Sequence, residues 1–183
     1  MRWFIFSLTL FSLILLTLLE MPQRRVEGVK FVPQILKAFD ETANQAIEEA
    51  QKIKGEGRDY ALRNVAETLA KAGQFDRAIK TAQKIKDDLQ YVYALTRIAK
   101  AFAKARQVKE AIKVFDQAIQ IAQRIKDARK RDYGFEEIAE ALAEAGQFDR
   151  AIQVAQRVRD EGWRAYTFVD ISKEWQKQVN LKK

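Results

Sequence analysis

AGQFDRAI at residues 72–79 recurs letter for letter at residues 145–152. A looser copy, ARQVKEAI, occupies residues 105–112 between them. A tyrosine precedes each of these three segments at a similar distance, and a fourth follows the last one. The spacings between Tyr60, Tyr93, Tyr133 and Tyr166 are 33, 40 and 33 residues. An eight-residue identity is far beyond chance, so the chain is built from internal repeats.

Each repeat has the apolar spacing of two consecutive helices. Leu62, Val65 and Leu69 lie on one helical face, and Ala78 and Ala82 resume the pattern after the turn. Gly73 separates the two runs, as a residue with positive φ at a helix C-terminus does. The repeated alanines favour close helix packing, because two helices approach closely only where one presents a small side chain.

The repeats divide the body, residues 34–181, into four units and a cap. We predict a partial unit at 34–57, full units at 58–90, 91–130 and 131–163, and a capping helix at 164–181. The 40-residue spacing reflects seven residues inserted in the second helix of the middle unit. Seven residues are close to two turns, so we expect this helix to keep its buried face and project about 10 Å further than its neighbours.

The first twenty residues form an apolar leader in which residues 3–19 carry no charge. The prediction is a transmembrane anchor or uncleaved signal at 1–20 and a juxtamembrane linker at 21–33, with a single-pass topology and an extracytoplasmic body. The alternatives are a cleaved signal, which would leave a secreted or periplasmic protein, and a buried soluble helix. No small-x-small cleavage site precedes Glu20.

The repeats resemble the tetratricopeptide repeat family. In the middle unit the resemblance is carried by Ala99, Phe102, Ala111, Phe115 and Ala118, and in the outer units by Ala66, Gly73, Ala78, Ala139, Gly146 and Ala151. The middle unit departs from the family with Arg106 in place of the turn glycine. The resemblance implies an all-α fold, a right-handed α-solenoid of tetratricopeptide-like hairpins after one N-terminal hydrophobic helix. It also implies a groove that holds a protein or peptide.

The composition argues against catalysis and against a metal or cofactor. The sequence has no Cys and no His, which removes thiolate chemistry, the commonest general base and the usual zinc ligands. The only Gly-x-Gly stretch, at residues 55–57, lacks the rest of a phosphate-binding loop. We therefore expect a binding protein and not an enzyme, with no cofactor.

The candidate groove consists of side chains on successive first helices. A tyrosine ladder would contact a bound peptide, or each ring would simply pack on the next repeat. Basic residues on one first helix face acidic residues on the next, either as a groove that selects a partner by charge or as pairs between neighbouring helices. The candidate groove residues are Tyr60, Arg63, Tyr93, Arg97, Lys100, Lys104, Tyr133, Glu136, Glu140 and Tyr166.

A basic cluster is predicted at the tip of the extended helix, within the segment that carries the whole positive excess of the chain. It comprises Arg124, Lys126, Arg129, Lys130 and Arg131. Such a cluster can dock on anionic lipid or an acidic partner, and the alternative is a solvated loop. The chain lacks a recognised nucleic-acid motif, which argues against nucleic acid as a partner. Besides an unidentified protein partner and the membrane, self-assembly of the repeats remains open.

Overall fold

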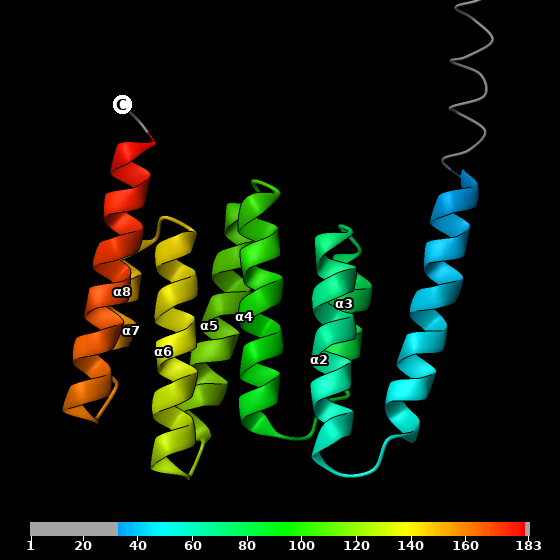
Figure 1. Ribbon diagram of the computed structural model, residues 1–183, viewed down its shortest axis with the longest axis horizontal. Helices are drawn as coiled ribbons and strands as arrows, with labels where there is room; N and C mark the ends of the chain where they lie inside the picture. Colours follow the sequence, from blue (N-terminus) through cyan, green and yellow to red (C-terminus); the bar gives the residue numbers. More distant parts are fainter. Residues whose placement is uncertain (1–32, 182–183) are drawn as a thin grey trace, which may run out of the picture. The chain divides into compact units, whose positions relative to one another are not determined.

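The computed structural model describes residues 33–181, and every regular element in this range is a helix (Figure 1). One helix covers residues 33–52. The others are α2 (Glu56–Lys71), α3 (Phe75–Ala82), α4 (Asp88–Lys104), α5 (Val108–Arg124), α6 (Ala128–Glu144), α7 (Phe148–Ala155) and α8 (Glu161–Asn180). The all-α prediction is confirmed for these residues.

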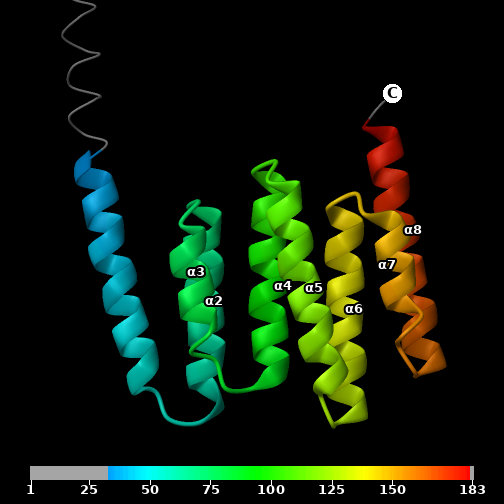
Figure 2. The same cartoon turned by 180° about the vertical axis from the view of Figure 1, so that it is seen from behind.

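The contacts divide the chain into two units, Met1–Gln45 and Ala46–Lys183. The packed hairpins all lie in the second unit. Within it, α2 packs on α3, α4 on α5, and α6 on α7, while α2, α4, α6 and α8 pack on one another in sequence order. We call these four the first helices, and α3, α5 and α7 the second helices; Figures 1 and 2 show the two sets from opposite sides.

The predicted anchor and nearly all of the linker lie outside the described residues. None of the helices between residues 33 and 181 has the length and apolar character needed to cross a bilayer. The described residues of the first unit, 33–45, all belong to the helix that covers residues 33–52.

The two identical octapeptides adopt the same structure. Gly73 and Gly146 have φ values of 78° and 75°, and each is followed by a second helix of 8 residues. The Gly73 N–H donates to the Ala70 carbonyl at 3.0 Å, and the Gln74 N–H to the Leu69 carbonyl at 2.9 Å. This pattern is a Schellman motif. The positive φ predicted at the turn glycine is confirmed.

The middle unit makes the same turn without glycine. Arg106 has a φ of 63°, and its N–H donates to the Ala103 carbonyl at 3.0 Å. The left-handed conformation costs a residue with a Cβ about 1 kcal/mol or more. The surrounding helices α4 and α5 therefore impose the turn against the local preference of the chain.

Small side chains stand where the helices come closest. Ala66, Ala99 and Ala139, one from each first helix of a full unit, are 0% exposed. A Cβ on Gly134 of α6 would lie 3.4 Å from the Ala122 Cβ of α5, which is a tight contact. These positions leave no room for larger residues, so the alanine pattern reports close packing.

Aspartates start three of the four first helices. Asp87, Asp127 and Asp160 are the N-caps of α4, α6 and α8, and each accepts the N–H of the residue three places on, at 2.8–2.9 Å. As a result, these helices begin three residues before the predicted unit limits. Helix α2 begins two residues before its limit, so Glu56 and Gly57 belong to it and not to the end of the preceding helix.

The inserted residues lengthen α5 as predicted, and they also displace α6. Helix α5 has 17 residues, against 8 in α3 and α7. The Asp59 carboxylate of α2 accepts an N–H 28 residues on, at the start of α4, and Asp132 of α6 does the same to the start of α8. The residue at the same phase in α4 is Val92, whose side chain faces Gly134, 42 residues on.

The difference of 14 residues is twice the insertion. The insertion accounts for seven of the 14 residues. The other seven mean that α6 is displaced along its axis against α4, compared with the α2–α4 pair, by about 10 Å at 1.5 Å per residue. The ion pair of Lys100 with Glu144, 44 residues apart, and that of Arg97 with Glu67, 30 apart, show the same shift. The expectation that only α5 projects further is therefore incomplete. Because α6 follows the end of the longer α5, it also begins about two turns further along the helix axes.

Candidate functional site

Tyr60, Arg63 and Tyr93 form the best-defined part of the predicted groove. The guanidinium carbon of Arg63 lies 4.5 Å from the Tyr60 ring centroid and 5.7 Å from the Tyr93 ring centroid. Tyr60 on α2 is 55% exposed, whereas Tyr93 on α4 is half-buried. Two rings thus hold one cation between neighbouring first helices, as cation–π attraction favours.

The tyrosines of the predicted ladder contact different neighbours. On α6, the residues close to Tyr93 include Glu136 and Glu137, whose charges add to burial in raising the Tyr93 pKa to about 12. Tyr133 pairs with Trp163 of α8, with ring centroids 5.1 Å apart in an edge-on arrangement. Tyr166 is 67% exposed. The four rings therefore have different surroundings. Tyr60 and Tyr93 flank Arg63, whereas Tyr133 lies close enough to Tyr93 to affect its pKa but packs on Trp163 of the next first helix.

Arg63 is a buried cation that has no ion pair within the described part of the chain. It is 8% exposed, its Nη1 donates to the Gln90 Oε1 at 2.9 Å, and its Nε has no acceptor. Burial lowers its pKa first, and the charge of Arg97 lowers it further. A guanidinium in this position favours the arrival of a negative charge, since unpaired buried charges are costly.

The basic stripe of α4 is largely paired with carboxylates of its neighbours. Glu67 of α2 receives both Arg97 and Lys71, the latter at 2.7 Å. Lys100 pairs with Glu144 of α6 at 2.8 Å. The alternative of pairing between neighbouring helices thus holds for these residues. Glu144 is one of the four acidic residues that the spacing places on the next first helix, with Glu136, Glu137 and Glu140, whereas Glu67 is a partner that the spacing did not indicate. Among residues 33–181, Lys104 has no ion pair.

A hollow of about 790 Å³ opens between the C-terminal halves of α2 and α4. Its charged lining consists of Glu67, Lys71, Arg97, Lys100, Lys104 and Glu137. Phe75 contributes an aromatic wall, stacked on the buried Phe102 with ring centroids 3.9 Å apart. Four of the six charged lining groups are basic, so the hollow suits an anionic group that also brings apolar surface.

Carboxylates gather on α6 and α8 beyond the hollow. The pKa of Glu140 is raised to about 7, first by burial and then by Glu136 and Asp170. The pKa of Glu136 is also raised, by burial and then by Asp170. The described residues contain no group of carboxylates arranged to hold a metal ion. Glu136, Glu140 and Asp170 thus form an acidic cluster on α6 and α8.

We give the name first-helix surface to the side chains of α2, α4, α6 and α8 described above, because one chain of contacts links them. Arg63 joins α2 to α4, Lys100 joins α4 to α6, and the Glu140–Asp170 interaction joins α6 to α8. Glu67, Lys71 and Asp170 were not among the residues predicted from the sequence. Helical spacing could have found Glu67 and Lys71, because they continue the Arg63 face at four-residue intervals.

The predicted basic tip is divided by the structure. Arg124 ends α5 and Lys126 lies in the following loop, whereas Arg129, Lys130 and Arg131 belong to the first turn of α6. Lys130 pairs with Asp87 at 3.0 Å, and the half-buried Arg131 donates to the Ile125 carbonyl at 3.3 Å. Two of the five therefore hold neighbouring parts of this chain, while Arg124, Lys126 and Arg129 are exposed.

The comparison with protein families gives one match. Residues 94–129 match the tetratricopeptide repeat model, a span that runs from the first turns of α4 through α5 to the start of α6. The resemblance to this family is therefore confirmed for the middle unit, and such repeats are usually non-catalytic and bind proteins. Neither a curated protein nor a solved structure matches the chain.

Proposed function

We propose that this protein is a non-enzymatic interaction module that holds a protein or peptide on its first-helix surface. The carrying observation is a tetratricopeptide repeat whose first helix, α4, forms one wall of an open hollow. The side chains that remain exposed there, among them Tyr60 and Lys104, are free to contact a partner. We further infer that the hairpins continue as a right-handed solenoid, the arrangement implied by the family.

The absence of cysteine from the sequence permits a direct test. Ala101→Cys places a single thiol in the lining of the hollow, and Lys113→Cys places one on the exposed side of α5. The tagged full-length chain is labelled with a bulky maleimide, and the proteins that co-purify with it are identified. Labelling at residue 101 should remove the captured partner, whereas labelling at residue 113 should leave it. Capture of the same proteins by both labelled variants would contradict the proposal.

The proposal includes a membrane tether at residues 1–20. It is supported by the uncharged sequence of residues 3–19 alone. A tether would confine the first-helix surface near the bilayer and raise the local concentration of a membrane-associated partner. The intact mass of the protein from its native membrane tests this: a mass that includes Met1 supports the tether, and a start beyond Glu20 favours a secreted or periplasmic module instead.

A self-assembling structural protein is the remaining alternative from the sequence. The exposed Trp175 and Val179 on α8, and Leu181 directly after it, are apolar side chains that a second copy could cover. Sedimentation of the full-length chain in detergent separates the two functions. A monomer at high concentration excludes self-assembly, whereas a concentration-dependent series of oligomers would favour it over partner binding.

A further inference from the structure

The first-helix surface changes its charge between its two helix pairs. On α2 and α4 the charged side chains are five basic and one acidic, namely Arg63, Lys71, Arg97, Lys100, Lys104 and Glu67. On α6 and α8 they include five acidic groups and two basic ones, namely Glu136, Glu137, Glu140, Glu144, Asp170, Lys173 and Lys177. The surface is therefore bipolar along the order of the helices.

Internal ion pairs do not cancel this polarity. At the basic end, Arg63 and Lys104 have no ion pair among the described residues. At the acidic end, neither Glu136 nor Glu137 has one. Arg63 is buried between two rings, but Lys104 is exposed and Glu136 and Glu137 are half-buried, so these three groups can meet an opposite charge. Opposite charges within a Debye length steer and orient a partner.

The hollow gives the basic end a shape as well as a charge. Its volume of about 790 Å³ holds several side chains, and it is open to solvent along the surface. Lys104 stands in its lining near the end of α4, and Phe75 provides an apolar contact. An acidic side chain with a carbon stem therefore fits the hollow better than a free inorganic anion does, because the stem covers the aromatic wall.

We propose that the partner is a bipolar protein segment, whose acidic residues enter the hollow between α2 and α4 and whose basic residues lie over α6 and α8. This inference rests on the proposed function and adds the chemistry and direction of the bound segment. The reversed direction would set basic groups against Lys104 and acidic groups against Glu136. Repulsion at both ends excludes it, as charge patterning does in other selective interfaces.

Synthetic peptides test the charge pattern without knowledge of the natural partner. The probe carries four Glu, an uncharged spacer and four Lys, and its isomer has the same composition with alternating charges. Binding to the full-length chain in nanodiscs of uncharged phosphatidylcholine is followed by fluorescence anisotropy. The block peptide should bind at least about tenfold more tightly than the isomer, and salt should weaken it more. Equal affinity of the two peptides would overturn the proposal.

Charge reversals locate the two ends. Lys104→Glu should weaken the block peptide about fivefold or more, the scale of one exposed ion pair and its reversal, and Glu136→Lys should do the same from the other end. Lys113→Glu and Glu110→Lys, on the exposed side of α5, are the matched controls and should leave the affinity unchanged. Circular dichroism of all four variants confirms that they fold.

Two results would identify another occupant and overturn the proposal. Equal weakening by the α5 controls would mean that the peptide follows net charge and not this surface. A dimer of the chain that Lys104→Glu dissolves, with peptide binding unaltered, would assign the surface to a second copy. The proposed function fails separately, if labelling at residue 101 does not remove the captured partner. Loss of a natural partner on that labelling, together with indifference to peptide polarity, would leave the function and remove only the bipolar segment.

Discussion

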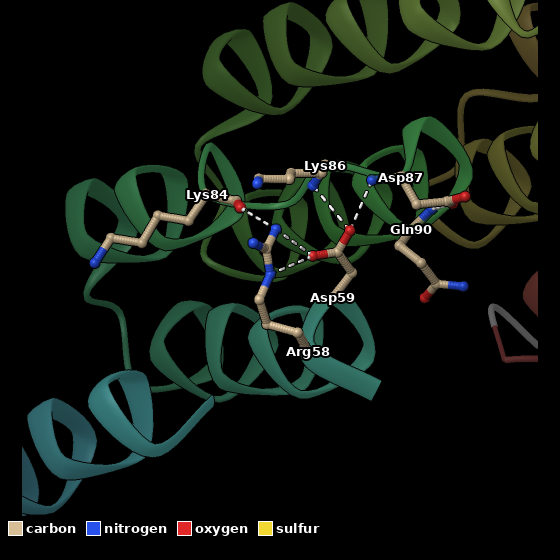
Figure 3. A network of polar contacts seen from close by, with 6 residues as sticks. All are labelled: Arg58, Asp59, Lys84, Lys86, Asp87 and Gln90. Atoms are coloured by element: carbon tan, nitrogen blue, oxygen red, sulfur yellow. Dashed lines mark hydrogen bonds and ion pairs between the residues drawn. The ribbon is translucent and has the colours of Figure 1, made fainter. Parts of the chain in front are cut away.

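Replacing Asp59 by alanine should destabilise the protein more than any other single carboxylate truncation on the first helices. Asp59 lies in the first turn of α2, is 6% exposed, and ties α2 to the start of α4 (Figure 3). Its Oδ2 accepts the N–H groups of Lys86 at 2.9 Å and Asp87 at 2.7 Å. Its Oδ1 accepts the Arg58 side chain at 2.7–2.9 Å.

The magnitude follows from these contacts. Each backbone hydrogen bond to a charged acceptor is worth about 1.5 kcal/mol net, and Asp59→Ala leaves both donors without it. The ion pair with Arg58 adds a smaller amount, so we expect a loss of about 3 kcal/mol in the free energy of unfolding. Asp59→Asn keeps one acceptor oxygen and should cost about half as much.

Asp132 provides the matched comparison within the same chain. It occupies the equivalent place in α6 and is equally buried, but it accepts only the Asp160 N–H, at 3.1 Å, and its Oδ1 has no partner. Asp132→Ala should therefore cost about 1 kcal/mol. The exposed Asp76 in the first turn of α3 serves as the control, with a change within about 0.5 kcal/mol.

Chemical denaturation of the full-length variants, followed by circular dichroism at 222 nm, measures these differences. The pH dependence gives an independent check. Burial raises the pKa of Asp59, but the hydrogen bonds from Asp87, Arg58 and Lys86 outweigh it, so the pKa is lowered from 3.8. The stabilisation is then complete above pH 3.8 and is lost as the pH falls through the folded-state pKa. Equal costs for Asp59→Ala and Asp132→Ala, or a cost that persists at pH 2, would refute the reasoning.

Three further predictions concern the turn, the acidic cluster and the shifted helix. Arg106→Gly should stabilise the protein by about 1 kcal/mol, because glycine adopts the positive φ without strain. Gly73→Ala at the equivalent turn should destabilise it by about the same amount. Denaturation midpoints that move in the same direction for both variants would contradict this. Glu140 binds its proton more tightly in the folded than in the unfolded state, so stability should fall as the pH rises from 4.5 to about 7. Glu140→Gln should remove about 1–2 kcal/mol of that fall, and Glu110→Gln on α5 should not. Val92→Asp introduces a carboxylate at the repeat position of Asp59, but here the side chain faces Gly134 and not the start of the next first helix. We expect a loss of about 3 kcal/mol in the free energy of unfolding, measured in urea. Little change would mean that α6 is not shifted.

The sequence predicts the local features of this fold well because they depend on neighbouring residues. The octapeptide contains its own stop signal at Gly73 and its own second helix, so its structure is the same at both places. The length of α5 follows equally from the inserted residues. The starts of the first helices could also have been found, because Asp87, Asp127 and Asp160 are strong N-cap residues at one place in each unit.

Contacts between helices were harder to predict, because a periodic pattern fixes a residue's face and not its height beside the next helix. The spacing correctly placed Tyr60 and Arg63 on one face and Tyr93 beside them. It gave no sign that α6 would be shifted by two turns against α4, since a seven-residue insertion preserves the buried face while shifting the helix that follows. The partner of Lys100 is Glu144 for the same reason.

The shift of α6 also explains why the first-helix surface separates into a basic and an acidic half. Helices α2 and α4 share one register, and α6 and α8 repeat it, as the 28-residue contacts of Asp59 and Asp132 show. Only the α4–α6 junction departs from it. With the unshifted register, the basic stripe of α4 would stand beside the equivalent positions of α6, where Glu136 and Glu140 could pair with it. The two-turn step leaves Glu144 as the paired acidic side chain and keeps Glu136 and Glu140 away from the lysines. The insertion in a second helix, on the other side of the hairpin, thereby keeps opposite charges apart on the surface that we propose binds the partner.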